Sequence, residues 1–246
     1  MKLEDIPQAF ARARRVAVIT GAGVSAESGV PTFRGEEGLW RNFRAEELAT
    51  PAAFARDPQL VWDWYDWRRG ICAKAEPNSA HLTIAAMEQH YPEFLLITQN
   101  VDGLHNRAGS KKIAEIHGNI WKARCTKCSS KFEIPETPLT EMPRCPDCKS
   151  LARPHIVWFG ESYDVDLLES VLQFLSRTEL VLVAGTSGMV PMPVYLTQHA
   201  MQAGAHAVDV NLEDSQLTPV VDASLRGKAG DVLPDLWRKV QSQATA

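Results

Sequence analysis

The sequence predicts an α/β protein in which a doubly wound parallel sheet is accompanied by a second, smaller domain. Three observations support this fold class. Short, nearly continuous apolar runs alternate with helical segments, which is typical of strands buried on both faces of a parallel sheet. Glycine-rich or polar segments follow several of these runs, at the edge where open sheets bind ligands. Four of the five cysteines form two C-x2-C pairs, which indicate a separate metal-binding module.

The composition argues against several classes of function. The chain has 246 residues, enough for one large domain with a smaller insertion. Its net charge of −4 argues against direct nucleic-acid binding but not against a local acidic face for lysine-rich peptides. The N-terminus lacks the apolar core of a signal peptide, and no apolar run approaches roughly 18 residues. We therefore expect a cytoplasmic protein without a membrane segment, and most simply a monomer.

The first strand and the turn after it organise the chain. An apolar, β-branched run over residues 15–20 predicts a strand. Gly21 and Gly23 follow at once and allow a tight turn and close approach of a ligand, such as a pyrophosphate at the start of the next helix. Ala26 stands where a third glycine often occurs. A dehydrogenase would add an acidic residue roughly 20 positions on, but Gly29 breaks the helix and an irregular segment follows.

A helical module is expected over residues 37–76. The segment has no strand pattern but many aromatic and charged residues, and two helices over 51–56 and 58–74 are the simplest interpretation. We interpret the remaining unusual residues of the module as packing residues: Trp62, Trp64, Trp67 and Cys72.

The other elements alternate regularly. Helices are expected over residues 2–14, 79–90 (capped by Asn78 or Ser79), 164–176, 194–203 and from Gly230 onwards. Strands are expected over residues 94–98, 113–116, 180–184 and 207–211, and segment 154–161 is expected to return to the main sheet. The predicted sheet domain comprises residues 1–36, 77–118 and 153–246, with the helical module over 37–76 and a metal-binding module over 119–152.

The cysteine pairs carry the strongest local signal. Cys125 and Cys128 form one C-x2-C pair, and Cys145 and Cys148 form the other. Without a secretory signal, this spacing favours a tetrahedral zinc site with four thiolates over disulfides. Four protein ligands leave no open coordination position, so we expect one zinc ion with a structural role.

Residues 16–35 as a whole closely resemble the NAD-binding motif of the sirtuins, the NAD-dependent protein deacylases, and further motifs follow in family order from about Arg15 to Trp237. The resemblance implies a Rossmann-like sheet domain, a small domain made of a zinc ribbon and a helical insertion, NAD as a consumed co-substrate, and acylated lysines of proteins as substrates. It implies these cofactor-binding residues: Gly21, Ala22, Gly23, Ala26, Glu27, Thr32, Phe33, Arg34, Gln99, Asn100, Asp102, Gly185, Thr186, Ser187, Asn211, Leu212 and Glu213.

His117 is the candidate base. Most histidines are surface or packing residues, but this one closes a short strand and precedes Gly118, and an imidazole is able to accept a hydroxyl proton near neutral pH. The run E-I-H-G resembles the sirtuin motif that carries the catalytic base. The resemblance also implies that Asn100 and Asp102 shape the nicotinamide pocket and poise the glycosidic bond for cleavage, and that Phe33 shields the reacting ribose carbon from water.

Tyr65 and Arg68 bear on the class of acyl group. Three residues apart on a helix, they share a face, and an arginine fork with a tyrosine hydroxyl suits a carboxylate. The pattern Y-x-x-R resembles the signature of class III sirtuins, which remove succinyl and malonyl groups, and Ala49 resembles the small residue that widens their acyl pocket. The alternative is an ordinary amphipathic helix with Tyr65 in the core and Arg68 in solvent.

Two segments are expected to border the substrate peptide. One resembles the family's peptide-binding wall, where an extended substrate adds a strand; it comprises Val157, Trp158, Phe159, Gly160 and Glu161. The other departs from the family, because this chain reads V-P-M-P over residues 190–193 where many relatives have valine, an aromatic residue and proline. The preferred peptide sequence therefore stays open.

Three alternatives to a class III deacylase stay open at the level of the sequence. The nearest is a deacetylase with weak activity on acidic acyl groups. A protein ADP-ribosyltransferase of the same fold would give Tyr65 and Arg68 no purpose. A nonenzymatic NAD sensor would have no use for an intact His117.

Overall fold

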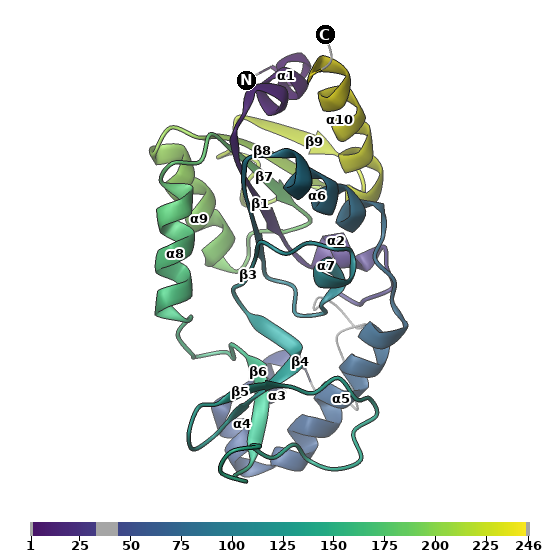
Figure 1. Ribbon diagram of the computed structural model, residues 1–246, viewed down its shortest axis with the longest axis vertical. Helices are drawn as coiled ribbons and strands as arrows, with labels where there is room; N and C mark the ends of the chain where they lie inside the picture. Colours follow the sequence, from purple (N-terminus) through teal and green to yellow (C-terminus); the bar gives the residue numbers. More distant parts are fainter. Residues whose placement is uncertain (1, 33–43, 245–246) are drawn as a thin grey trace.

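The computed structural model describes residues 2–32 and 44–244. These residues form a large domain around a six-stranded sheet and a small domain around a three-stranded sheet (Figure 1). The predicted cofactor residues Phe33 and Arg34 lie outside the described residues.

The large sheet is parallel throughout, which confirms the predicted fold class. Its strands lie in the order β3-β2-β1-β7-β8-β9, and every neighbouring pair runs in the same direction. Their bounds are Arg15–Thr20 (β1), Glu93–Thr98 (β2), Ile113–Glu115 (β3), Leu180–Ala184 (β7), His206–Asn211 (β8) and Ala223–Arg226 (β9). Strand order reverses between β1 and β7, and such a switch point is where doubly wound sheets bind ligands.

Strand β1 shows why the sheet is covered on both sides. All six of its residues are buried, and because successive side chains point to opposite faces, its four apolar residues divide between two cores. Val16 and Val18 pack with helices α1 (Ile6–Arg12), α6 (Ser79–His90) and α10 (Ala229–Ala244). Ala17 and Ile19 pack with α8 (Val165–Leu175) and α9 (Pro191–Gln202), which lie together on the other side of the sheet in Figure 1.

The small domain combines an antiparallel sheet with a helical layer. The sheet has the order β5-β4-β6, with bounds Lys131–Glu133 (β5), Gly118–Cys125 (β4) and Ala152–Ile156 (β6). The helices are α3 (Ala45–Leu48), α4 (Pro51–Arg56) and α5 (Pro58–Lys74), so the two helices predicted for this module are confirmed. Sheet and helices share one core, in which Trp62 and Trp64 are fully buried.

Helix α5 (Figure 1) connects the two layers of the small domain through one face. Asp57 caps its first turn by accepting a hydrogen bond from the Leu60 N–H at 3.0 Å, and Pro58 occupies the first helical position. Along the helix, the Trp62 indole N–H donates to the Ala152 carbonyl at 2.9 Å. One to two turns further on, the Arg69 guanidinium donates to the carbonyls of Ile134 and Glu136.

Several predicted elements differ from the structure. Strand β6 does not return to the main sheet, because it pairs antiparallel with β4 in the small sheet. The prediction was wrong because an apolar run alone does not indicate which strand it pairs with. Strand β4 leads into the first cysteine pair and β6 follows the second, so the metal-binding module brings the two strands together. The domain boundaries themselves stay a prediction.

Smaller differences concern helix ends and one strand. The lead-in helix is shorter than predicted and is preceded by the 3-10 turn η1 (Leu3–Asp5). Helix α9 begins at Pro191, since proline is favoured at a first helical position, so most of segment 190–193 is helix and not loop. Strand β9 was not predicted. Within residues 2–32 and 44–244, none of the helices combines the length and apolar character that a membrane span requires.

Candidate active site

Two glycine turns interlock at the carboxyl ends of β1 and β7. The Gly21 N–H donates to the Ala184 carbonyl at 3.0 Å, and the Gly23 N–H donates to the Gly185 carbonyl at 2.8 Å. A Cβ atom added to Gly23 would lie 2.8 Å from the Gly185 Cα, and Gly185 has a φ of +62°. The backbones thus approach more closely than side chains allow. Helix α2 (Ala22–Ala26) starts from this turn.

A buried hydrogen-bond network joins this turn to the end of β2. The Asn100 amide donates to the Gly21 carbonyl at 3.0 Å and to the Ser25 hydroxyl at 3.1 Å. Ser25 in turn donates to the Asp102 carboxylate at 2.8 Å. Burial raises the pKa of Asp102, while the Leu104 N–H and the Ser25 hydroxyl, which hydrogen-bond the carboxylate, oppose that rise. The network holds two predicted catalytic residues in fixed positions.

The same sheet edge places the other predicted ribose and phosphate contacts together. The Gln99 amide donates to the Thr186 hydroxyl at 3.0 Å. The Asn211 amide, at the end of β8, donates to the Thr186 carbonyl at 2.7 Å. Residues from the ends of β2, β7 and β8 therefore meet around Thr186, as the positions of the polar segments predicted.

His117 lies beside this group with a defined tautomer. Its Nδ1 atom is 3.1 Å from the Gln99 carbonyl oxygen. A carbonyl only accepts hydrogen bonds, so Nδ1 carries the proton and Nε2 keeps a free electron pair. Burial lowers the pKa of His117, and the hydrogen bond to Gln99 partly offsets this effect. At neutral pH the imidazole is therefore an uncharged base.

A pocket separates the sheet edge from helix α5. One wall comes from the large domain and includes Ala22, Ser25, Thr32, Asn100 and Asp102. The other wall is a face of α5 whose members recur at helical spacing: Trp64, Trp67, Arg68, Ile71 and Cys72. The pocket thus brings predicted cofactor residues and one predicted acyl-binding residue to a common space.

Arg68 and Tyr65 share a helix face, but they differ in burial. The Arg68 guanidinium carbon lies 4.8 Å from the Trp64 ring centre and 5.3 Å from the Tyr65 ring centre. Burial lowers the pKa of Arg68, yet an arginine stays charged in proteins. Tyr65 lies behind it, fully buried, and its hydroxyl accepts a hydrogen bond from the Trp158 indole at 2.8 Å. Arg68 lines the pocket, whereas Tyr65 supports the wall from behind.

The predicted peptide-binding wall is largely occupied by contacts within the chain. The Phe159 N–H donates to the Ala49 carbonyl at 3.0 Å, which attaches the wall to the helical module. The Glu161 carboxylate accepts hydrogen bonds from Arg153 and Arg124 and from the Trp158 N–H. In all, four N–H groups of the segment already donate within the chain: those of Val157, Trp158, Phe159 and Glu161.

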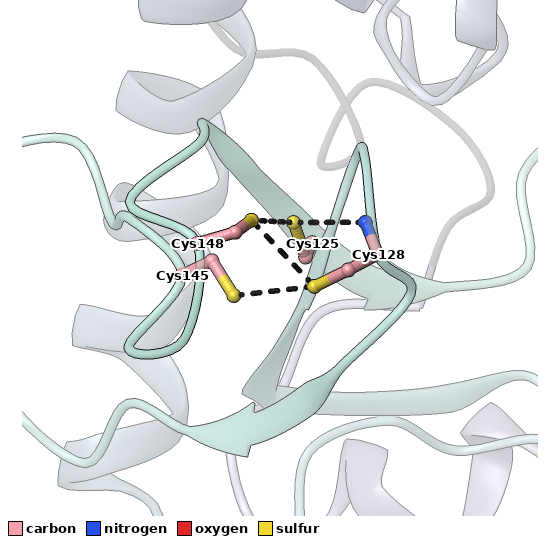
Figure 2. A group of neighbouring side chains, drawn as sticks. All are labelled: Cys125, Cys128, Cys145 and Cys148. Atoms are coloured by element: carbon pink, nitrogen blue, oxygen red, sulfur yellow. Dashed lines mark hydrogen bonds between the residues drawn. The ribbon is translucent and has the colours of Figure 1, made fainter.

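The four cysteines form a cluster away from this edge, between two similar turns (Figure 2). Their sulfur atoms all lie within 4.8 Å of one another. The Cys125 and Cys148 sulfurs are 3.4 Å apart, and those of Cys128 and Cys145 are 3.6 Å apart. Zn–S bonds of about 2.3 Å in a tetrahedron place sulfurs about 3.8 Å apart. The cluster therefore fits one zinc ion with four thiolate ligands.

The backbone of the two turns supports this geometry. Ser129 and Lys149, each directly after a second cysteine, both have a φ of +60°. The N–H groups of Lys127 and Cys128 lie 3.3 and 3.4 Å from the Cys125 sulfur, where they stabilise a thiolate. The predicted zinc ligands are thus brought together as expected.

Comparison with known proteins decides the family. A model described as the Sir2 family matches residues 21–192. The chain belongs to the Sir2 family.

Relatives and solved structures are similar to this Sir2-family chain over nearly its full length. An NAD-dependent protein deacylase of Leptospira interrogans is 53% identical over 92% of this chain and 93% of its own. One of Thermococcus kodakarensis is 48% identical over 94% and 93%. A crystal structure described as a Sir2 homolog–NAD complex is 43% identical, with a TM-score of 0.93 over 99% of this chain and 96% of its own.

Not every predicted residue of the Sir2-family chain lies near the pocket. Ala26, Glu27, Leu212 and Glu213 are exposed. The Glu27 carboxylate accepts a hydrogen bond from the Gly230 N–H at 3.0 Å, which joins the end of α2 to the start of α10. Their cofactor roles stay predictions.

Several side chains at the site were not predicted from the sequence. Trp64, Trp67 and Cys72, which were interpreted as packing residues, line the pocket. Ser25 connects Asn100 to Asp102, and its position inside the glycine motif was the only available signal. Tyr163 lies 3.4 Å from His117, and nothing in the sequence around it indicated that contact.

Proposed function

We propose that this chain removes succinyl and malonyl groups, and also acetyl groups, from protein lysines, in a reaction that consumes NAD and gives nicotinamide, O-acyl-ADP-ribose and free lysine. Its coarser part, NAD-dependent protein deacylation, rests on membership in the Sir2 family and on relatives at 45–53% identity that carry this name. The preference for acidic acyl groups rests on one side chain, Arg68.

Arg68 supports that preference because it is a cation in an otherwise apolar wall. It lines the same pocket as Asn100 and Asp102, and its neighbours on α5 are Trp64, Trp67 and Ile71. A free carboxylate at the end of an acyl chain would find a charged, forked hydrogen-bond donor on this wall. Tyr65 lies behind this wall and is fully buried, with its hydroxyl bound by the Trp158 indole, so it would support Arg68 and would not bind the carboxylate itself. A small residue at Ala49 would leave room for a longer acyl chain, as the resemblance to class III sirtuins implies.

The cofactor would lie along the sheet edge. NAD supplies a glycosidic carbon that accepts the acyl oxygen as nicotinamide leaves. The interlocked turns of Gly21, Gly23 and Gly185 would let the backbone approach the phosphates, and Gln99 and Thr186, which hydrogen-bond to each other, would bind the riboses. Asn100 and Asp102 are held rigidly by Ser25, which suits a pocket that grips nicotinamide while its bond breaks.

His117 would act as the general base. Its Nε2 atom carries the free electron pair, and burial keeps the ring uncharged. It takes the proton of a ribose hydroxyl so that the oxygen attacks the carbon of the transferred acyl group. The zinc ion would hold the small domain together and take no part in these steps. We further propose a cytoplasmic, monomeric enzyme that does not bind nucleic acid directly.

The test compares one peptide that carries acetyl-, malonyl- or succinyl-lysine, with NAD present, by nicotinamide release. We expect much faster turnover of the two acidic acyl groups. A preference for the acetyl peptide would support the deacylase reaction but contradict the proposal that Arg68 binds the carboxylate of the acyl group. If no peptide releases nicotinamide but labelled ADP-ribose is transferred to protein, the result favours a transferase. If neither nicotinamide release nor ADP-ribose transfer occurs, the remaining alternative is an NAD sensor.

The variant Arg68→Met tests the assignment directly. It keeps the apolar stem and removes the charge, and we expect it to lose roughly 1.5–3 kcal/mol of transition-state binding for succinyl substrates, or about 10- to 100-fold in kcat/KM. Acetyl turnover should hardly change. The matched control is Arg56→Met, an exposed arginine at the end of α4. Equal losses on both acyl groups would mean that Arg68 is a packing residue.

A further inference from the structure

The two ring nitrogens of His117 differ in their ability to release a proton. Its Nδ1–H is bound to the Gln99 carbonyl at 3.1 Å, and a backbone carbonyl does not take up a proton at neutral pH. A proton that arrives at Nε2 therefore has to leave from Nε2. Any group that helps it leave has to be a hydrogen-bonding partner of that atom.

The structure provides such a partner. The Tyr163 hydroxyl oxygen lies 3.4 Å from His117 Nε2, and the two rings stack with centres 5.7 Å apart and an angle of 24° between their planes. Tyr163 belongs to the segment between β6 and α8 and is partly exposed, so the same side chain contacts both the partly buried His117 and the solvent.

We propose that Tyr163 is a positioning residue for His117 and the group through which the proton gained at Nε2 leaves the site. The inference rests on the proposed role of His117 as the base. While no ribose hydroxyl is bound, the Tyr163 hydroxyl donates to the electron pair of Nε2 and its ring holds the imidazole in place. The ribose hydroxyl replaces Tyr163 as the donor to that electron pair when it binds. After the ribose O–H bond breaks and the Nε2–H bond forms, the Tyr163 oxygen accepts that proton as its own hydroxyl proton passes to water. Tyr163 is neutral before and after the transfer.

Neighbouring carboxylates are poorly suited to the same task. Glu115 on β3 is bound by Asn119 and by Lys122, the latter at 3.0 Å. Asp164, next to Tyr163, is bound by Lys131 and by the Leu167 N–H, both at 3.2 Å. Asp102 accepts from Ser25 and Leu104. Each is committed to another donor, whereas burial raises the pKa of Tyr163 and keeps its hydroxyl protonated at neutral pH.

The variant Tyr163→Phe separates the hydroxyl from the ring stack, and two reactions report on it. Exchange of labelled nicotinamide into NAD, with the acylated peptide present, reports only the first step, before the base acts. Deacylation reports the whole sequence. We expect exchange to stay near the wild-type rate and deacylation to fall about tenfold, the low end for a lost proton-transfer group because water substitutes in part. A high concentration of a small external base, such as imidazole, should restore part of the loss.

The matched control is Tyr195→Phe, which removes the hydroxyl of a half-exposed tyrosine on α9 whose ring lies 6.3 Å from the His199 ring, at a tilt of 37°. It should change neither reaction. Unchanged deacylation in Tyr163→Phe would overturn the proposal, and so would an equal fall in both reactions, which indicates a purely structural effect. These outcomes leave the deacylase assignment intact. That assignment fails separately, if the wild-type enzyme releases no nicotinamide from any acylated peptide.

Discussion

The two domains achieve a fixed geometry by different means. In the large domain, every residue of β1 is buried, and its four apolar residues pack into two apolar cores. In the small domain, one core of mainly aromatic and aliphatic side chains is supplemented by four clustered cysteines and by buried charged groups. Arg69 is fully buried there, and Arg153 is nearly so.

The difference suggests which domain depends on specific contacts. Apolar burial is spread over many side chains and tolerates volume-conserving substitution of any one of them. A metal site or a buried ion pair concentrates free energy in a few atoms, and the loss of one partner leaves the other unsatisfied. We therefore expect single changes to affect the small domain more severely, although the predicted cofactor residues lie mostly in the large domain.

Zinc removal should give the largest effect. Structural zinc sites contribute about 10–16 kcal/mol in small peptides, so chelation or Cys145→Ser should unfold the region from β4 to β6 while β1, β7 and β8 stay folded. Hydrogen exchange of the backbone amides in each strand measures this directly. Cys72→Ala, outside the cluster, is the control and should keep the zinc. If the amides of β4 stay protected after complete zinc loss, the small domain does not depend on its metal site more than the large domain depends on its core.

Arg69→Met should come next. Arg69 pairs with Asp66 at 3.2 Å, three residues apart on α5, and also holds two carbonyls. Breaking a buried pair costs about 3–5 kcal/mol. The large domain offers a matched pair, because Arg238 lies 3.1 Å from Asp235 at the same spacing on α10 but is exposed. Arg238→Met should cost at most about 1 kcal/mol. Chemical denaturation of both variants makes the comparison, and similar costs would contradict it.

Gly23→Ala should have a smaller effect on stability, of about 1–3 kcal/mol, but a clear effect on NAD binding. The added Cβ would meet the Gly185 backbone at 2.8 Å and push the two turns apart. Gly70 on α5 has nothing within 4 Å of its Cβ position, so Gly70→Ala should stabilise the chain by about 0.5–1 kcal/mol. Denaturation and calorimetric NAD titration separate the two effects. Full NAD affinity in Gly23→Ala would mean that the turn tolerates expansion.

The smallest effect concerns acid sensitivity in the large domain. Burial lowers the pKa of His81 to about 4, whereas an unfolded histidine takes up a proton near 6.5. The unfolded state then binds more protons, so the free energy of unfolding falls as the pH is lowered from about 6.5 toward 4. Between pH 7 and 6 the loss should be about 1 kcal/mol or less. Denaturation curves at both pH values should show that the free energy of unfolding depends less steeply on pH in His81→Gln than in the wild type. An unchanged slope would mean that other groups cause the pH dependence.

Local patterns predicted the parts of the fold that local chemistry determines. The buried strands, the glycine turn after β1, the capped helix α6 and the cysteine pairs are each specified within a few residues, and all are present. The partner of β6 is not local. Its apolar residues resemble those of a main-sheet strand, and only its antiparallel register with β4 distinguishes the two cases.

The site divides in the same way. Spacing placed Tyr65 and Arg68 on one helix face, but not which of the two would reach the pocket. The sequence predicted that His117 lies at the end of a strand. The stacking of Tyr163 on His117 depends instead on the path of the segment between β6 and α8 past the large sheet. Contacts between distant segments have no signal in a single sequence.

Helix α5 has a practical consequence for redesign. The face that holds the zinc-binding module presents Trp62, Asp66 and Arg69, and the face toward the pocket presents Trp64, Arg68 and Ile71. The two sets share no residue and recur at their own helical spacing. A library confined to positions 67, 68 and 71 would therefore vary the pocket without altering the buried Trp64 or the residues that hold the zinc-binding module. A chain built in this way is open to gradual change of substrate by mutation and selection.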